Sequence, residues 1–364
     1  MENDKFLNEQ IITYIGNKRL LLKNIEAQVL KIQQKLNKTK TVNADLFSGS
    51  GIVARMLKQY SSVLYVNDFE KYCYVLNKCY LTNQKDFNEK AYNFYYQQLQ
   101  QELSSNLISG ILTNNYAPTF DDQITINDRV FYTKHNAQII DTIRNYIKKL
   151  PLEIQPFFLA PLLYQASVHV NTAGIFKGFY KDKQTKIGKF GGTAENALAR
   201  ITKDIVLDQP IFSNYSCQVE ITCQDAIEVA KQYHDFDIVY LDPPYNQHPY
   251  GSNYFMLNVI VENKLPAEIS KISGIPIDWQ RSNYNKKSKI YQELETLIAT
   301  IDSKYLILSY SSDGFLTLND ITTILEKYGD YEVEQISYNT YRGSRNLNKR
   351  KIYVQEYLFV LEKS

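Results

Sequence analysis

The chain has 364 residues, of which 44% are hydrophobic and 22% are charged, and its formal net charge is +2. This composition is typical of a soluble globular protein with enough material for a large core or for two unequal lobes. No uninterrupted apolar stretch approaches the roughly 20 residues that a spanning helix needs, and the first residues, MENDKFLNEQ, do not resemble a signal peptide. We therefore expect no membrane partner and a cytoplasmic location, while the small net charge neither favours nor excludes a polyanionic partner.

The four cysteines do not suggest a metal site or a disulfide framework. They lack the two-residue spacing of common zinc sites and are too few to cross-link a chain of this length. We expect no metal, and buried, reduced thiols at Cys73, Cys79, Cys217 and Cys223. The 30 tyrosines provide flat surfaces that can stack on bases, although such richness also occurs in ordinary cores.

Residues 42–57 predict the first strand and helix of a doubly wound sheet, joined by the glycine turn FSGSG. The turn is followed by neither the Lys-Ser nor the Lys-Thr pair of a phosphate-binding loop, and it lacks the third glycine of the dinucleotide fingerprint. It therefore favours a small nucleoside such as S-adenosylmethionine, although two glycines can also simply make a tight turn into a helix.

The next strand, residues 61–68, ends on Asp68, 19 residues after Gly49. Nucleoside-binding folds keep an acid for the ribose at about this spacing. The amino-acid tail of S-adenosylmethionine needs both signs of charge, and Asp45 and Lys18 are candidates for its ammonium and its carboxylate. A strand-end carboxylate and a solvated lysine at a helix start explain these two residues equally well.

Residues 81–212 do not alternate regularly between strand and helix, and we interpret them as an inserted target-recognition domain. The regular pattern resumes with a strand and a helix in residues 217–233, and further strands are expected at Phe236–Leu241 and within residues 304–312 and 351–362. The expected fold is α/β. It consists of a Rossmann-like S-adenosylmethionine-dependent methyltransferase sheet, formed by residues 1–80 and 213–364 and interrupted by the insertion.

The most specific motif is Asp-Pro-Pro-Tyr, which directly follows the strand Phe236–Leu241. Two consecutive prolines remove two N–H donors, so the tip presents only acceptors in a rigid arrangement. Asp242 and the carbonyl of Pro243 can together accept both hydrogens of an exocyclic amino group and direct its lone pair at an electrophile. A stacking role for Tyr245 and a flipped or unpaired base complete the hypothesis. The expected catalytic residues are Asp242, Pro243, Pro244 and Tyr245.

The four residues alone also fit a rigid turn at the end of a strand. That alternative weakens because a strand–glycine–helix unit of the nucleoside type precedes the motif in the same chain.

In this order of segments the chain resembles the Dam-like, class alpha DNA adenine-N6 methyltransferases. That family has a Tyr-x-Gly-x-Lys type segment, as at residues 14–18, then a glycine turn, a DNA-reading lobe and the Asp-Pro-Pro-Tyr tip. The resemblance implies methylation of a flipped adenine at a specific site in double-stranded DNA, with a cognate restriction endonuclease as a candidate partner. The cofactor-binding residues that it implies are Tyr14, Lys18, Asp45, Phe47, Gly49, Gly51, Asp68 and Asp225.

Three basic segments are candidate DNA contacts. The first, residues 175–192, interleaves lysines with Phe176, Phe179, Tyr180 and Phe190, a pattern that suits a nucleic-acid surface but also a solvated hairpin. The others are residues 279–289 and residues 341–351. The expected phosphate contacts are Lys177, Lys181, Lys183, Lys186, Lys189, Arg342 and Arg345.

Four other functions remain open at this point. An rRNA adenine-N6 methyltransferase can use the same tip and cofactor, but a long insertion better fits the reading of a duplex sequence. A cytosine-N4 enzyme is disfavoured because the resemblance links an acid at position 242 with adenine. A non-catalytic DNA-binding subunit is disfavoured by the intact motif, and an NAD-linked oxidoreductase by the missing third glycine.

Overall fold

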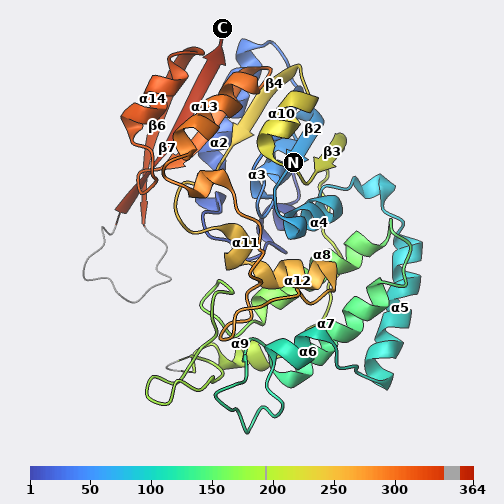
Figure 1. Ribbon diagram of the computed structural model, residues 1–364. Helices are drawn as coiled ribbons and strands as arrows, with labels where there is room; N and C mark the ends of the chain where they lie inside the picture. The colour runs from blue at the N-terminus through green and yellow to red at the C-terminus, as the bar shows by residue number, and fades with distance from the viewer. Residues whose placement is uncertain (193–194, 340–352) are drawn as a thin grey trace.

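The computed structural model describes residues 1–192, 195–339 and 353–364. The described residues form two lobes (Figure 1). One lobe is built around a β-sheet and carries both ends of the chain, and the other is helical. None of the helices in the described ranges is long and apolar enough to cross a membrane.

The sheet has seven strands in the order β3-β2-β1-β4-β5-β7-β6. The first five strands of this order are parallel, whereas β7 runs antiparallel to both of its neighbours. The arrangement confirms the predicted α/β, Rossmann-like fold. The strands are β1 (Thr41–Asp45), β2 (Ser61–Asn67), β3 (Gln218–Thr222), β4 (Phe236–Leu241), β5 (Ser303–Ser311), β6 (Gly329–Asn339) and β7 (Tyr353–Lys363).

Helices cover both faces of the sheet, which is why all six residues of β4 are buried and all but Asp237 are apolar or aromatic. Ile238 and Tyr240 pack in the core under α2, α3 and α4, while Val239 and Leu241 pack under α10, α13 and α14. The helices of this lobe are α1 (Asp4–Asn8), α2 (Leu22–Lys35), α3 (Ile52–Lys58), α4 (Lys71–Tyr80), α10 (Ala226–Gln232), α13 (Ile290–Thr300) and α14 (Leu318–Leu325), with short 3-10 turns η1 (Arg19–Leu21) and η3 (Asn283–Asn285).

Residues 81–212, the predicted insertion, supply most of the helical lobe. Its elements are η2 (Gln84–Asp86), α5 (Glu89–Ser105), α6 (Ile111–Tyr116), α7 (Lys134–Ile147), α8 (Gln155–Val168) and α9 (Leu198–Thr202).

A second segment, which follows β4, also packs against this lobe. It contains α11 (Tyr250–Asn253) and α12 (Phe255–Glu262). The guanidinium of Arg144 on α7 donates to the carbonyl oxygens of Ile260 and Val261 at distances of 2.7 and 2.8 Å. These residues lie within the range 213–364 that the sequence assigned to the catalytic part. The helical lobe thus includes residues from outside the predicted insertion 81–212. The domain boundaries remain a prediction.

Candidate active site

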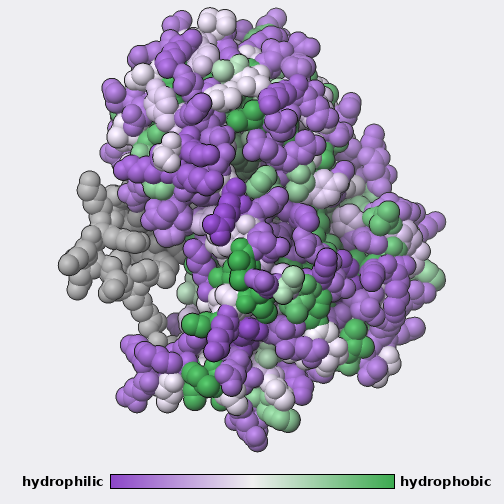
Figure 2. Space-filling model, in the orientation of Figure 1, coloured by the Kyte–Doolittle hydropathy of each residue, from purple (hydrophilic) through white to green (hydrophobic). Residues whose placement is uncertain are grey.

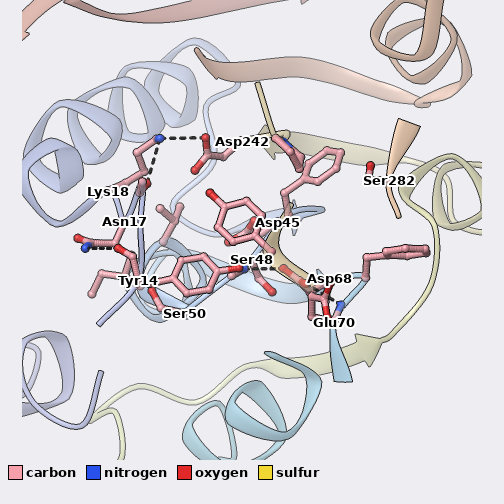
Figure 3. A pocket seen from close by; sticks show the side chains of 18 of the residues that line it. Tyr14, Asn17, Lys18, Asp45, Ser48, Ser50, Asp68, Glu70, Asp242 and Ser282 are labelled. Carbon is pink, nitrogen blue, oxygen red and sulfur yellow. Dashed lines mark hydrogen bonds and ion pairs between the residues drawn. The ribbon is translucent and has the colours of Figure 1, made fainter. Parts of the chain in front are cut away.

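The site lies where the carboxyl ends of β1, β2 and β4 meet. In parallel doubly wound sheets ligands bind at this edge, at the point where the strand order reverses, and here β1 has β2 on one side and β4 on the other. A cavity with about 760 Å³ of space, counting its open mouth, lies at this edge. Figure 3 shows Tyr14, Asp45, Asp68 and Asp242 around it.

The glycine turn lets the backbone line this cavity closely. Gly49 and Gly51 adopt φ angles of +51° and +79°, in the left-handed region that favours glycine. A Cβ on Gly49 would lie 2.7 Å from the ring of Tyr14, and one on Gly51 would lie 2.5 Å from the side-chain oxygen of Asn77. A larger residue at position 49 would therefore displace Tyr14, which lines the cavity, and one at position 51 would displace Asn77.

Two acids follow β2. The carboxylate of Asp68 accepts from the backbone N–H groups of Gly49, at 2.7 Å, and Glu70, at 2.9 Å, which ties the end of β2 to the glycine turn. Glu70 also lines the cavity and accepts from the side-chain amide of Asn258 at 2.7 Å. Burial raises the pKa of Glu70 to about 7. The ribose role expected for Asp68 remains a prediction, and Glu70 is a second candidate acceptor that the sequence analysis missed.

Asp45, the last residue of β1, is fully buried at the cavity wall. Neither of its carboxylate oxygens makes a well-formed hydrogen bond within the described part of the chain. Burial raises the pKa of Asp45 well above its ordinary value, and the nearby carboxylates of Asp242 and Asp68 raise it further, although backbone N–H groups of Phe47 and Ala54 lower it somewhat. A buried carboxylate without a partner is costly, so Asp45 is suited to receive a cationic donor from a ligand.

The charge of the cavity fits S-adenosylmethionine. Among its described lining residues, the carboxyl groups of Asp45, Asp68, Glu70 and Asp242 face a single ammonium, that of Lys18. A sulfonium ligand with an α-ammonium group would supply the missing positive charge, and the free carboxylate of Asp45 would accept from that ammonium.

Asp242 stands directly after β4 and is held by Lys18. The ammonium of Lys18 lies 2.9 Å from Asp242 and 3.1 Å from Glu356 on β7 (Figure 3 draws the bond to Asp242). Burial raises the pKa of Asp242 to about 6, with Lys18 lowering it and Glu356 raising it. Lys18 was expected to meet the carboxylate of the cofactor, and that role stays a prediction. In the structure its ammonium is shared between two carboxylates of the chain.

Tyrosines fix the segment that carries Lys18. The ring of Tyr14 stacks on Tyr250 and on Tyr254, with centroids 4.8 Å away in each case. The hydroxyl of Tyr250 donates to the carbonyl oxygen of Ile15 at 3.1 Å. The hydroxyl of Tyr254 accepts from the N–H of Ile15 at 2.8 Å. Elements that pack with the helical lobe thus hold one wall of the cavity.

The structure gathers most of the predicted site residues. Tyr14, Lys18, Asp45, Phe47, Gly49, Asp68, Asp242 and Pro244 all line the cavity. Gly51, Pro243 and Tyr245 lie next to lining residues without lining it themselves, and Asp225 caps α10 by accepting from the N–H of Ile227 at 2.9 Å. Their roles remain predictions.

Other lining residues were not anticipated. They include Glu70, Tyr250, Gln280, Ser282 and Asn285. Only Glu70 carried a signal in the sequence, as an acid two residues beyond the expected ribose acid.

The lysine-rich segment forms a hairpin with a bridge between Lys181 and Gly188. Lys181, Lys183 and Lys186 are exposed at its end, as a phosphate-binding surface requires. Two of the interleaved aromatic residues do not contribute to an exposed surface, because Phe176 and Phe179 are 1% and 9% exposed in the core. These rings anchor the hairpin instead. Arg342 and Arg345 lie outside the described residues.

A largely parallel sheet with an acidic cavity at its switch point, and an Asp-Pro-Pro-Tyr tip beside that cavity, is the arrangement expected of an S-adenosylmethionine-dependent methyltransferase. A family model described as "D12 class N6 adenine-specific DNA methyltransferase" matches residues 14–324. Since the match spans most of the chain, the protein belongs to this family, and its methyl donor is S-adenosylmethionine.

Three relatives are similar over nearly the whole chain. The type II methyltransferase M.NlaIII of Neisseria lactamica is 28% identical, covering 97% of this chain and 100% of that protein. M.CviAII of Paramecium bursaria Chlorella virus 1 is 29% identical, covering 96% and 97%. The modification methylase StsI of Streptococcus sanguinis is 31% identical, covering 96% of this chain and 52% of that protein.

Among solved structures, the chain shows a weak similarity to magnesium protoporphyrin IX methyltransferase from Synechocystis PCC 6803, which was crystallised with bound S-adenosylmethionine. The TM-score is 0.31 at 10% identity, covering 94% of this chain and 81% of that one. A similarity at this level carries no argument about this protein.

Proposed function

We propose that this protein transfers a methyl group from S-adenosylmethionine to the N6 amino group of one specific adenine in double-stranded DNA. The observation that carries the proposal is the position of Asp242. Its carboxylate opens into the same cavity as the unpartnered Asp45, so the acceptor for a target amino group and the acceptor for the cofactor ammonium share one chamber.

The residues of the Asp-Pro-Pro-Tyr tip act by positioning the target amino group for methyl transfer. S-adenosylmethionine supplies an activated methyl group on a sulfonium. The side chain of Asp242 is 19% exposed, so it is buried enough to act in a low dielectric and open enough to meet a base. As a carboxylate it accepts one N6 hydrogen, and the carbonyl of Pro243 accepts the other, which directs the nitrogen lone pair at the methyl carbon. When the new bond forms, N6 loses one proton, which Asp242 can take.

The base must leave the duplex to reach this chamber, because its N6 amino group cannot meet Asp242 from inside the base stack. The proposed role of Tyr245 is to stack on the flipped base. Its ring packs edge to face with Tyr310, with centroids 5.9 Å apart, and its backbone carbonyl accepts from Phe315 at 2.8 Å. The ring is therefore held before the base arrives.

The helical lobe is the proposed target-reading part. Figure 2 shows a face that is largely hydrophilic, with hydrophobic residues gathered over the helical lobe. The exposed lysines of the 175–192 hairpin supply positive charge for phosphates. Because the names of the relatives include a type II methyltransferase and a modification methylase, we also propose a cognate restriction endonuclease as the cellular partner.

The test uses purified protein, duplex DNA and S-adenosylmethionine with a labelled methyl group. We expect label in N6-methyladenine only, and sequencing of DNA from expressing cells should place it in one recurring sequence. Asp242→Ala is the inactive control, and Glu362→Gln, at an exposed position near the end of β7, is the matched active control. Label in RNA but not in DNA, or in cytosine, would overturn the proposal.

A further inference from the structure

A carboxylate on the closing strand completes the cluster around Asp242. Glu356 on β7 is 0% exposed, and its Oε1 accepts from Lys18 at 3.1 Å and from the hydroxyl of Ser309 on β5 at 2.7 Å. Ser309 and Glu356 lie diagonally across the antiparallel β5–β7 pair. Through Ser309, Glu356 and Lys18, the strands β5 and β7 are linked to Asp242 by hydrogen bonds and ion pairs.

Within the described part of β7, the next two residues on the same face as Glu356 are apolar. Glu356, Leu358 and Val360 alternate along one face of the strand, and the latter two belong to the hydrophobic core. A buried charge costs several kcal/mol of desolvation, and an apolar side chain of similar volume is often the more stable choice. The acid therefore indicates a role other than stabilising the sheet.

Resting on the proposed function, we propose that Glu356 is a positioning residue for methyl transfer. It holds the ammonium of Lys18 between two carboxylates, so that Lys18 orients Asp242 without fully neutralising it. Asp242 then stays more basic than it would be beside Lys18 alone, and a more basic carboxylate is the stronger acceptor for the target amino group.

The remaining ionisable groups around this cluster do not replace Glu356. Asp45 interacts with Asp242 from the cavity side, where burial raises the pKa of Asp45 and the carboxylates of Asp242 and Asp68 raise it further. Tyr240, Tyr245 and Tyr250 face it from β4, the tip and α11, and the pKa of each is raised by burial, so they stay neutral near pH 7. Asp313 acts on Tyr245 from the loop after β5.

The charges of the cluster agree with this role. Burial lowers the pKa of Lys18, but the attraction of Asp242 and Glu356 outweighs burial and leaves that pKa well above its ordinary value. Lys18 is therefore a permanent cation. Without the charge of Glu356, the ammonium of Lys18 attracts Asp242 alone. The pKa of Asp242 should therefore be lower in a variant that lacks this charge.

The test is Glu356→Gln, which keeps the shape and removes the charge. We expect kcat to fall roughly tenfold or more, as for loss of a charge-assisted hydrogen-bond network, with an unchanged KM for S-adenosylmethionine. The acidic limb of the pH–rate profile should move to lower pH, and Glu356→Asp should restore part of kcat. Glu362→Gln, an exposed glutamate on the same strand, is the matched control.

A second measurement does not depend on activity. The pKa of Asp242 can be followed by NMR of protein carrying ¹³C-labelled aspartate, with Asp242→Asn assigning the signal. We expect a lower pKa in Glu356→Gln than in wild type, and an unchanged value overturns the inference. So does a raised KM for S-adenosylmethionine, because Lys18 would then serve the cofactor tail. If wild type yields no N6-methyladenine, the proposed function fails, whereas this NMR comparison still decides the charge coupling.

Discussion

Asp242 is the residue on which the proposed chemistry depends. Its carboxylate contacts the target amino group in our proposal, whereas Asp45 and the acids after β2 face the cofactor. We therefore expect Asp242→Ala to lower kcat about 10²–10³-fold, as for loss of a preorganised transition-state partner, with nearly unchanged binding of S-adenosylmethionine. Calorimetric titration with the cofactor and single-turnover kinetics measure the two effects. Wild-type turnover by the variant would contradict the assignment.

The pH dependence of wild type follows from the same residue. Since burial raises the pKa of Asp242 to about 6 and the ionised form is the acceptor, kcat should fall as the pH drops through about 6 and reach a plateau above it. A rate profile between pH 5 and 8 checks this at saturating substrates. A flat profile across that range would mean that Asp242 does not act as a carboxylate.

Asp45 should show a trade-off between stability and binding. Because its pKa is raised in the folded protein, the folded state holds a proton that the unfolded state releases, and stability falls as the pH rises between the two pKa values. Asp45→Asn removes this loss. We expect the ligand-free variant to gain about 1–3 kcal/mol in free energy of unfolding at neutral pH, and little near pH 4, while S-adenosylmethionine stabilises it less than wild type.

Asp237 is the control for this prediction. It is also a buried acid, but the ammonium groups of Lys38 and Lys304 lie 2.7 and 2.9 Å from its carboxylate. Its pKa is accordingly lowered, so Asp237→Asn should destabilise the protein. If both asparagine variants destabilise it equally, Asp45 is not an unpaired acceptor.

At the scale of elements, the lysine-rich hairpin is separable from the catalytic chamber. Changing Lys181, Lys183 and Lys186 to Ala should weaken binding to cognate and unrelated duplexes alike, because phosphate contacts position a protein without reading sequence. The slope of log affinity against log salt should shrink by about 0.9 for each contact removed. Titrations of both duplexes at several salt concentrations measure this.

The control is a variant in which Lys31, Lys231 and Lys327 are changed to Ala. It removes the same number of positive charges as the hairpin variant, but from helices α2 and α10 and from just beyond the end of α14 in the sheet lobe. This control should leave the salt slope unchanged. Equal salt slopes for the two variants would show that the hairpin does not contact DNA. A loss of affinity confined to the cognate duplex would mean that the hairpin lysines contact bases.

At the scale of the whole molecule, the two lobes are joined by one core. The same hydrophobic cluster contains Ile238 of β4, Tyr116 of α6 and Phe255 of α12, and Arg144 binds the end of α12 through two carbonyls. We therefore expect one cooperative thermal transition, shifted upward by S-adenosylmethionine through preferential binding to the folded state. Scanning calorimetry checks this, and two separated transitions would show that the lobes unfold independently.

Much of the fold follows from local patterns. Apolar runs and alternation predicted strands beginning at residue 42, at residues 61–68 and at residues 236–241, close to the observed bounds, because burial on both faces of a parallel strand leaves a direct trace in the sequence. Glycines at positions 49 and 51 predicted the turn, since few other residues adopt its backbone angles. The Asp-Pro-Pro-Tyr tip and the order of the segments indicated the family, which the family match confirms.

The sequence by itself thus determined the α/β class, the cofactor and the identity of the acidic residues at the strand ends. Only the tertiary structure decided which charges meet. Lys18, near the start of the sequence, pairs with Asp242 and with Glu356, near its end. Phe176 and Phe179, from the lysine-rich hairpin, are buried in the core. The physical reason is that local periodicity encodes which face of an element is buried, whereas the partner of a buried charge depends on which strand ends the completed sheet brings together.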